Sequence, residues 1–384
     1  MTDLSALVLA NPLDDDRVLV GVRLGERARR ASVLAGVDAE NVHVVRSAAD
    51  LEDAKVAVLG PVIVIDATAQ VVMTSLVEHF VASSDERVGY DQARDQYAGI
   101  FRIDATRLDA LWAALQVNFA SSAKLAAAIP GKLTTLPIDR HPVRNDGEFR
   151  AASEWIFQFV NKPLLDAPVT KYFYRPIARP FTRLFVNLPF TPNHITIVSI
   201  VIGQIACVIA ARPGYWDHVI GIFSMAFISG ILDNVDGELS RLRLQSSKLG
   251  AALDGVGDDL LRLSLLLALG VHCAPQFPSL PVMWMAIASV AFTILAMAPM
   301  YWYCVGTLKT WNIQNYNTVM GPESTNPLVK IGGQIARRDF VDVATFVLAL
   351  LGIPIAAVVM FSIGSLVGFI TVIPAHLKVV RARA

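Results

Sequence analysis

The stretch ILDNVDGELSRLRLQSSKLGAALDGVGDDL, residues 231–260, lies between two long apolar runs of the chain. It carries seven residues at the spacing D-x2-D-G-x3-R-x8-G-x3-D-x3-D: Asp233, Asp236, Gly237, Arg241, Gly250, Asp254 and Asp258. An ionised aspartate near the centre of a membrane helix costs roughly 2.5–3.5 kcal/mol on insertion scales. Four aspartates at the edge of a membrane therefore need a partner of opposite charge, and a divalent metal ion is one such partner.

The spacing places the carboxylates on two helix faces. Asp233 and Asp236 lie on one face of a helix, and Asp254 and Asp258, four residues apart, lie on one face of a second helix. Two helices that present two carboxylates each form an all-oxygen pocket, which suits Mg²⁺, Mn²⁺ or Ca²⁺ better than zinc or copper. Arg241 lies about one turn beyond Asp236, where its guanidinium can form two hydrogen bonds to a phosphate.

The spacing resembles the signature of the CDP-alcohol phosphotransferase family, D-x2-D-G-x2-A-R-x8-G-x3-D-x3-D. Ser240 stands where that signature has alanine, and both side chains are small enough for close helix packing. The resemblance implies that two divalent ions, Mg²⁺ or Mn²⁺, hold the pyrophosphate of a CDP-alcohol. An acceptor hydroxyl then attacks the β-phosphorus, and CMP leaves. The implied metal ligands are Asp233, Asp236, Asp254 and Asp258.

The resemblance also implies roles for individual residues of the motif. Asp258 would be the general base as well as a ligand, taking the proton from the acceptor hydroxyl. Gly237 and Gly250 would let the cytidine and phosphates of the CDP-alcohol lie against the backbone. Arg241 would bind diphosphate oxygens, with Ser247 as a hydroxyl donor.

Two other interpretations of the acidic stretch stay open. A charged loop between two membrane spans would need no metal. A divalent-cation transporter could use the same four carboxylates as an ion path, but it would not require Gly237, Arg241 and Gly250 at this spacing. Release of CMP distinguishes the enzyme from the transporter.

The composition divides the chain into a soluble part and a membrane part. Of its 384 residues, 54% are hydrophobic, and the mean hydropathy of +0.49 is high for a soluble protein. The apolar runs gather in the second half. We therefore expect an α/β cytoplasmic domain over residues 1–140, an interfacial amphipathic segment over 150–190, and an all-α membrane domain over 191–384.

The membrane domain is expected to contain six transmembrane helices, at about residues 195–211, 217–239, 253–272, 281–304, 339–353 and 355–377. Basic residues in the loops at 241–248 and 305–338 and in the C-terminal tail fall on one side of the membrane if both termini are cytoplasmic. The expected location is the cytoplasmic membrane, with the motif open to the cytoplasm. The sequence TPNHIT at 191–196 resembles the usual start of the family's first span, and Thr191 can cap that helix with Pro192 in its first turn.

The segment 150–190 mixes aromatic and basic side chains, which suits a helix in the lipid headgroup layer. Alternatively, Lys171 and Arg175, one turn apart, bind a phosphate of the acceptor. Arg337 and Arg338 at the start of the fifth span are either a topology signal or part of the same anion pocket. Such a pocket would favour a phosphorylated acceptor, such as an inositol or glycerol phosphate.

The N-terminal part shows an alternating α/β pattern. Strands are expected near 6–10, 41–46, 56–66 and 99–103, and helices near 25–35, 74–83 and 105–127. The fragments at 24–45, 62–72 and 97–104 resemble a sugar-nucleotide-type nucleotidyltransferase. Such domains precede the membrane domain in bifunctional enzymes of the inositol-phosphate cytidylyltransferase and di-inositol-phosphate synthase type, which make CDP-inositol and then use it.

This domain departs from the nucleotidyltransferase pattern where a triphosphate would bind. Those enzymes need a glycine-rich loop and a following basic residue, but here the first strand runs into ANPLDDDRVLVG, with three acidic residues. The remaining candidates are Asp66 for a metal and Arg17 or Arg23 for phosphate. We expect a degenerate domain kept for scaffolding, dimerisation or regulation; the alternative is a bifunctional enzyme that also makes its own donor.

The expected partners are a CDP-alcohol donor, a hydroxyl acceptor that is a phosphorylated polyol if the anion pocket forms, and membrane lipid, with no nucleic acid. CDP-diacylglycerol as donor would give a phospholipid, whereas CDP-inositol or a similar soluble donor would give a polyol phosphodiester or a lipid headgroup. The fused arrangement slightly favours the soluble donor. The family resemblance also implies a homodimer.

Overall fold

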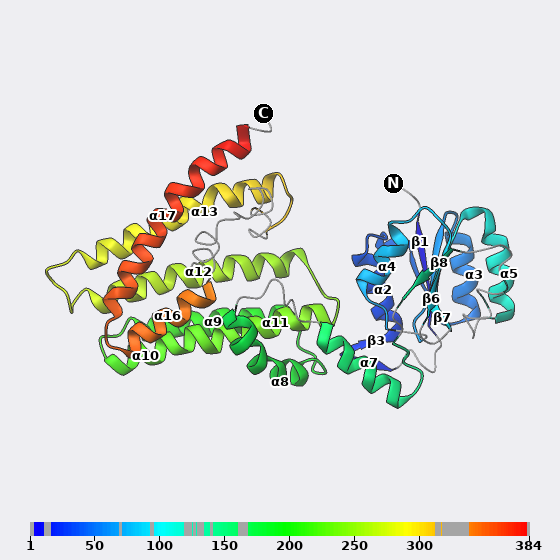
Figure 1. Cartoon of the computed structure of the whole chain (residues 1–384), viewed down its shortest axis with the longest axis horizontal. Helices are drawn as coiled ribbons and strands as arrows, with labels where there is room; N and C mark the ends of the chain where they lie inside the picture. The colour runs from blue at the N-terminus through cyan, green and yellow to red at the C-terminus, as the bar shows by residue number, and fades with distance from the viewer. Residues whose placement is uncertain are drawn as a thin grey trace. The chain divides into compact units, whose positions relative to one another are not determined.

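The computed structural model describes residues 4–10, 17–68, 71–92, 96–118, 134–138, 141–159, 168–311 and 338–381, together with Leu125, Ala128 and Tyr316. The chain divides into two compact units, one built on a β-sheet and one built from helices (Figure 1). The first unit consists of Met1–Asn161 with two short segments, Val186–Leu188 and Arg241–Gln245. The second unit consists of Lys162–Phe185, Pro189–Ser240 and Ser246–Ala384.

A six-stranded mixed sheet forms the centre of the first unit, in the order β4-β1-β5-β7-β6-β8. Its strands are β1 (Ser5–Leu9), β4 (Val42–Val45), β5 (Val62–Asp66), β6 (Arg87–Asp91), β7 (Gln96–Ile103) and β8 (Thr134–Pro137). β1 runs parallel to β4 and β5, whereas β7 is antiparallel to β5. β6 is antiparallel to β7 and parallel to β8. A separate two-stranded sheet contains β2 (Val18–Leu19) and β3 (Val22–Arg23).

Helices α2 (Leu24–Leu34), α3 (Ala48–Ala57), α4 (Thr74–Val81) and α5 (Leu108–Asn118) pack around this sheet. A further helix of this unit is α7 (Asp146–Phe159). Every residue of β1 is buried, as expected for a parallel strand covered on both faces. Leu7, Val64, Phe101 and Leu115 belong to one hydrophobic core that joins the sheet to α5. The prediction of an α/β first region is confirmed.

One predicted element of this unit has a wrong boundary, and the end of another is not tested. The strand expected from residue 56 begins only at Val62, because residues 56–57 end α3. A capping box stabilises the first turn of α3. Ser47 Oγ accepts a hydrogen bond from Asp50 N–H at 3.2 Å, and the Asp50 carboxylate accepts one from Ser47 N–H at 3.0 Å. The helix expected over 105–127 begins with a 3₁₀ turn and continues as α5; residues 119–124 lie outside the described residues.

Arginines hold the two short segments within the first unit. The Arg27 guanidinium, 1% exposed, donates to Leu242 O at 2.7 Å. Arg243 donates to Val186 O at 2.7 Å and to Leu188 O at 2.6 Å. In each bond a charged guanidinium donates to a backbone carbonyl at or just beyond the end of a helix. Such a charge-assisted hydrogen bond is stronger than one from a neutral donor.

The second unit is helical in all its described elements. These are a π-helical turn η3 (Thr170–Tyr174), α8 (Arg175–Phe185), α9 (Pro192–Ala210), α10 (Tyr215–Phe223), a π turn η4 (Ser224–Ser229), α11 (Gly230–Leu242), α12 (Lys248–Cys273), α13 (Val282–Gly306), α16 (Arg338–Leu350) and α17 (Pro354–Arg381). Each of the six predicted spans is a helix or a run of joined helices, with ends shifted by a few residues. Thr191 caps α9 by accepting from His194 N–H, and Pro192 is in its first turn, as predicted.

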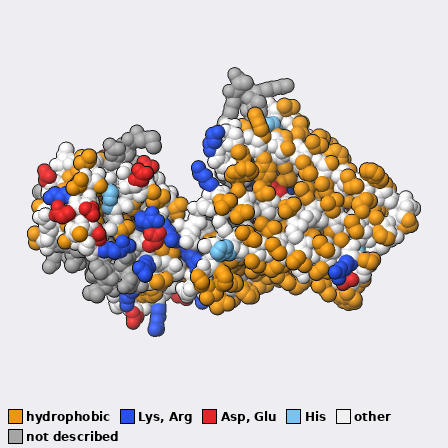
Figure 2. Space-filling model, turned by 180° about the vertical axis from the view of Figure 1, so that it is seen from behind, with side chains coloured by type: hydrophobic (Ala, Val, Ile, Leu, Met, Phe, Trp, Pro, Cys, Tyr) orange, Lys and Arg blue, Asp and Glu red, His pale blue; other side chains and the backbone are white. Residues whose placement is uncertain are grey.

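Four of these helical runs are long and apolar enough to cross a membrane: Pro192–Ala210, Tyr215–Leu242, Val282–Gly306 and Pro354–Pro374. Hydrophobic side chains cover most of the visible face of the helical unit (Figure 2). The six predicted spans are thus only partly supported. α16 has 13 residues, too few to cross a bilayer of ordinary thickness. α12 has 26 residues, but its first half contains several charged side chains, among them Asp254, Asp258 and Arg262.

Small residues let α9, α10 and α12 approach one another closely, as is common where membrane helices pack. A Cβ atom on Gly221 of α10 would lie 2.3 Å from Ala210 N of α9. Ser199 of α9 and Ser229 of η4 donate to each other's carbonyl oxygen at 2.9 and 3.0 Å. This packing fixes α9 against the helical run that carries the first two aspartates of the motif.

Candidate metal and phosphate site

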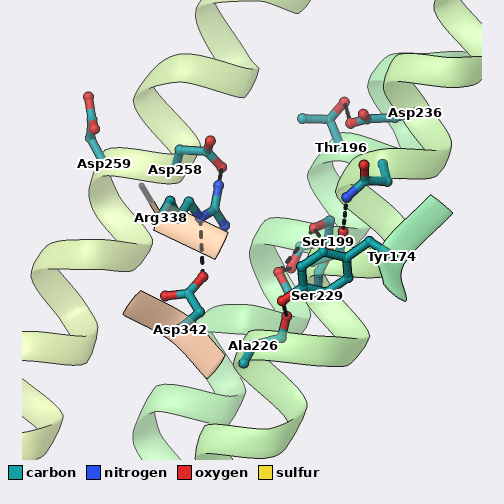
Figure 3. Close-up of polar contacts among 12 residues, drawn as sticks. Tyr174, Thr196, Ser199, Ala226, Ser229, Asp236, Asp258, Asp259, Arg338 and Asp342 are labelled. Atoms are coloured by element: carbon teal, nitrogen blue, oxygen red, sulfur yellow. Dashed lines mark hydrogen bonds and ion pairs between the residues drawn. The ribbon is translucent and has the colours of Figure 1, made fainter. Parts of the chain in front are cut away.

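The π turn η4 immediately precedes the motif helix α11. Such turns are often found at functional sites, because they change which face the following helix presents. Two of its carbonyls accept hydrogen bonds from other elements: Ala226 O from Tyr174 Oη at 3.0 Å, and Ser229 O from Ser199 Oγ at 2.9 Å (Figure 3). These bonds stabilise the π turn and so set the rotation of α11.

Three of the four motif aspartates gather. Carboxylate oxygens of Asp233, Asp236 and Asp254 lie within 4.8 Å of one another, with Asp236 buried, Asp233 half-buried and Asp254 exposed. Thr196 of α9 donates a hydrogen bond to the Asp236 carboxylate (Figure 3). Three negative charges this close repel one another unless a cation lies between them. The donor set is all oxygen and comes from two helices, so these residues fit a hard divalent cation such as Mg²⁺.

The fourth aspartate lies elsewhere in the site. Asp258 forms an ion pair with Arg338 of α16, and Arg338 Nε lies 3.5 Å from Asp342 Oδ2 (Figure 3). Asp258 is one turn beyond Asp254 on α12, about 6 Å farther along the axis. Thus the spacing places both on one face, but only Asp254 reaches the cluster. The roles of Asp258 as ligand and base stay predictions.

The remaining motif residues lie at the ends of the two helices. Ser247 is the N-cap of α12, and its Oγ accepts from Gly250 N–H at 2.9 Å, so this hydroxyl already stabilises the helix end. A Cβ atom on Gly250 would lie 2.8 Å from Asn193 Oδ1, so glycine here permits the close approach of α9. Gly237 and Arg241 lie on α11, about one turn apart.

The structure separates the two basic residues of the predicted acceptor site. Lys171 is exposed, with its Nζ 5.2 Å from the centre of the Tyr172 ring. Arg175 is buried and forms an ion pair with Glu238 of α11, Nη1 to Oε1 at 2.9 Å. Thr182 Oγ1 donates to the other Glu238 oxygen at 2.7 Å. Glu238 was not predicted as part of this site, although an acidic residue within the motif but off the aspartate face was a usable signal.

The second basic pair is only partly described. Arg337 lies outside the described residues, and Arg338 is held by the two carboxylates of Asp258 and Asp342. Thr170 of η3 donates a hydrogen bond to Asp339 at the start of α16. This bond brings the turn that carries Lys171 next to α16, so parts of the two predicted basic clusters do lie together.

In the first unit, the candidate nucleotide-binding residues have local structural partners. Asp66 ends β5 and accepts from Thr68 N–H at 3.0 Å and Thr68 Oγ1 at 2.8 Å. Arg17 pairs with Asp146 at 2.6 Å and donates to Val143 O at 3.2 Å. Arg23 ends β3, and the acidic residues 14–16 lie outside the described residues.

Comparison with known proteins identifies the helical region. Residues 189–321 match the family described as CDP-alcohol phosphatidyltransferase. A bifunctional IPC transferase and DIPP synthase of Aquifex aeolicus is 26% identical over 136 residues, covering 35% of this chain and 30% of that protein. The protein of the same name from Thermococcus kodakarensis is 31% identical over 113 residues, covering 29% of this chain and 24% of that protein.

The chain thus aligns with less than a third of the length of these relatives. The matched region contains all the motif residues, including the three clustered aspartates. The helices that carry the aspartate cluster lie within the region that matches the family. Residues 189–321 of this chain, which include the aspartate cluster, are similar to the CDP-alcohol phosphatidyltransferase family.

Proposed function

We propose that the helical unit transfers a phosphoalcohol group from a CDP-alcohol to an acceptor hydroxyl and releases CMP. The observation that carries this proposal is the group of Asp233, Asp236 and Asp254, drawn from two helices within the matched region. A loop of scattered surface charges would not bring three carboxylates within 4.8 Å of one another.

These three aspartates would hold Mg²⁺ or Mn²⁺, which when bound supplies positive charge for the diphosphate of the donor. Arg241, at the end of α11, donates hydrogen bonds to phosphate oxygens. Thr196 fixes the Asp236 carboxylate by its hydrogen bond, so this side chain does not have to be ordered when the donor binds. Catalysis at such a site is mainly positioning and charge stabilisation.

Asp258 is the proposed general base. Its ion pair with Arg338 fixes the carboxylate in orientation. The acceptor oxygen forms a bond to the β-phosphorus as its proton passes to an Asp258 oxygen, and the bond from this phosphorus to the CMP oxygen breaks. Asp342 contributes by sharing Arg338, so that the guanidinium stays in place when Asp258 becomes protonated.

The membrane arrangement belongs to the same proposal. Six helices cross the cytoplasmic membrane with both termini in the cytoplasm, and α12 and α16 turn their charged residues toward the site. A homodimer follows from the family resemblance. The first unit has the role of a degenerate nucleotidyltransferase-like scaffold, which is supported by the local structural partners of Asp66 and Arg17.

The test is CMP release by the purified chain with Mg²⁺, offering CDP-diacylglycerol and CDP-inositol separately with a panel of polyols and polyol phosphates. Asp258→Asn should lower release by about 10²–10⁴-fold, the usual effect of losing a general base. The matched control is Asp259→Asn. This neighbour accepts a hydrogen bond from Tyr301 at 2.5 Å, and an amide oxygen can still accept it.

Release by the wild type and by Asp259→Asn, with loss in Asp258→Asn, supports the proposal. Equal release by both variants would remove Asp258 from the mechanism. No release with any pair, together with Mg²⁺ uptake into proteoliposomes, would favour the transporter. Pyrophosphate release from CTP and a polyol phosphate would show that the first unit is active.

A further inference from the structure

The segment that joins the two motif helices belongs to the first unit. α11 ends at Leu242 and α12 begins at Lys248, and Arg241–Gln245 is part of the first unit. Arg241, the motif arginine proposed to bind the donor, is therefore in a segment that the first unit holds. The groups that hold it come from α2 and from the hairpin of β2 and β3.

Two arginines of α2 donate hydrogen bonds to carbonyls at the end of α11. Arg27 Nη1 donates to Leu242 O at 2.7 Å, and Arg30 Nη1 donates to Arg243 O at 3.0 Å. The last carbonyls of a helix have no partner within the helix and carry partial negative charge, so a guanidinium stabilises them. Arg27 is buried, and among the described residues its other hydrogen bond goes to Met73 Sδ, a weak acceptor, at 3.2 Å. Movement of the α11 end would thus leave a buried charge without its main acceptor.

The backbone near these contacts is strained. Leu244, just beyond α11, has a φ of 52°, and Val20, at the tip of the β2–β3 hairpin, has a φ of 51°. Bulky and β-branched residues persist in this left-handed region only where surrounding contacts hold them. A Cβ atom on Gly21, next to Val20, would lie 2.0 Å from Val186 O and 2.9 Å from Arg243 Nε. Tertiary contacts therefore fix both the hairpin tip and the end of α11.

We propose that α2 positions the motif arginine: Arg27 and Arg30 hold the end of α11 so that Arg241 stays placed for the diphosphate of the donor. Arg241 precedes the held carbonyls of Leu242 and Arg243 by one and two residues, so freedom at that helix end becomes freedom of its guanidinium. Order that is missing before binding has to be created during binding, which lowers affinity. The inference rests on the proposed function and deepens it, because it gives the first unit a role in donor binding that needs no nucleotidyltransferase chemistry.

The affinity of the full-length chain for cytidine 5′-diphosphate can be measured without turnover, by calorimetry in detergent micelles with Mg²⁺. Arg30→Gln removes the bond to Arg243 O and should weaken binding about tenfold, or about 1.4 kcal/mol. Arg30→Lys, which keeps a charged donor, should restore part of the affinity. The matched control is Arg29→Gln. Arg29 is the next residue on α2 and pairs with the same carboxylate, Glu26, as Arg30 does, but its described hydrogen bonds go only to Glu26.

A double-variant cycle with Arg241→Gln shows whether Arg30 acts through the motif arginine. In the Arg241→Gln background, Arg30→Gln should change the affinity by less than about twofold, because the group that it positions is gone. A general loss of folding would instead lower the affinity in both backgrounds. Hydrogen exchange of residues 241–246 should be faster in Arg30→Gln than in Arg29→Gln. In assays of CMP release, Arg30→Gln should raise the donor KM about tenfold and leave the acceptor KM unchanged.

Equal affinity of Arg30→Gln and Arg29→Gln for cytidine 5′-diphosphate would overturn the inference and leave the transferase intact if the wild type releases CMP. An undiminished effect of Arg30→Gln in the Arg241→Gln background would overturn it as well. Binding that depends on Arg30, without CMP release from any donor and acceptor, would support the held helix end and overturn the proposed function. A wild type that neither binds cytidine 5′-diphosphate nor releases CMP would overturn both.

Discussion

Removing one partner of the ion pair between Arg175 and Glu238 should strongly destabilise the helical unit. Arg175 is 6% exposed and Glu238 is 2% exposed, and Thr182, which donates to the same carboxylate, is fully buried. Glu238→Gln keeps the size and an oxygen acceptor but removes the carboxylate charge that pairs with the buried Arg175. Removing one partner of a buried pair costs about 3–5 kcal/mol.

That cost predicts a large fall in melting temperature. For a unit of this size, 1 kcal/mol lowers the melting temperature by about 2–4 °C, so Glu238→Gln should melt roughly 6–20 °C below the wild type. A thiol-reactive dye can follow this unit alone, because the three cysteines of the chain, Cys207, Cys273 and Cys304, are free and buried within it. High salt should not mask the effect, because buried charges are poorly screened.

Two further variants decide whether the pair is the cause. Arg179→Ala, on the exposed face of α8, should change stability by about 0.5 kcal/mol or less. The double variant Arg175→Met with Glu238→Leu should lose less than the two single variants together, because neither charge is then left alone. Melting of Glu238→Gln within about 2 °C of the wild type, or additive losses in the double variant, would refute the reasoning.

Three other predictions concern packing, pH and metal. Gly221→Ala places a Cβ 2.3 Å from a backbone nitrogen of α9 and should cost about 1–3 kcal/mol, whereas Gly306→Ala meets nothing and should cost nothing in the same dye assay. Hydrogen bonds, chiefly from the backbone N–H of Arg46, lower the pKa of Asp50. Its stabilisation is therefore present above its unfolded pKa of about 3.9 and is lost as the pH falls through the lower folded value. Faster hydrogen exchange of α3 in Asp50→Asn should be seen at pH 7 and should diminish as the pH falls below about 3.9; the same difference at every pH would contradict this. EDTA should abolish CMP release and Mg²⁺ should restore it, and saturating Mg²⁺, at about 100 times its Kd, should stabilise the wild type by about 2.7 kcal/mol but not Asp254→Asn.

Local sequence patterns predicted the secondary structure correctly where it depends only on neighbouring residues. Apolar runs predicted the helices of the second unit because a segment embedded in lipid has to satisfy its backbone hydrogen bonds internally, which a helix does. Thr191 and Pro192 predicted the start of α9 because a cap depends only on the adjacent turn. The prediction failed at residue 56, where the alternating pattern suggested a strand. The capping box at Ser47 begins a helix that continues to Ala57, so residue 56 is helical.

The spacing of the motif determined by itself that acidic side chains share helix faces, because the helical period is a local property. Only the tertiary structure decided which of them meet. Asp254 joins Asp233 and Asp236, whereas Asp258 pairs with Arg338, a residue 80 positions later in the chain. The Arg175–Glu238 pair likewise depends on how separate helices pack. Sequence fixes the direction of a side chain on its own helix, but the distance between side chains on different helices is set by packing of the whole core.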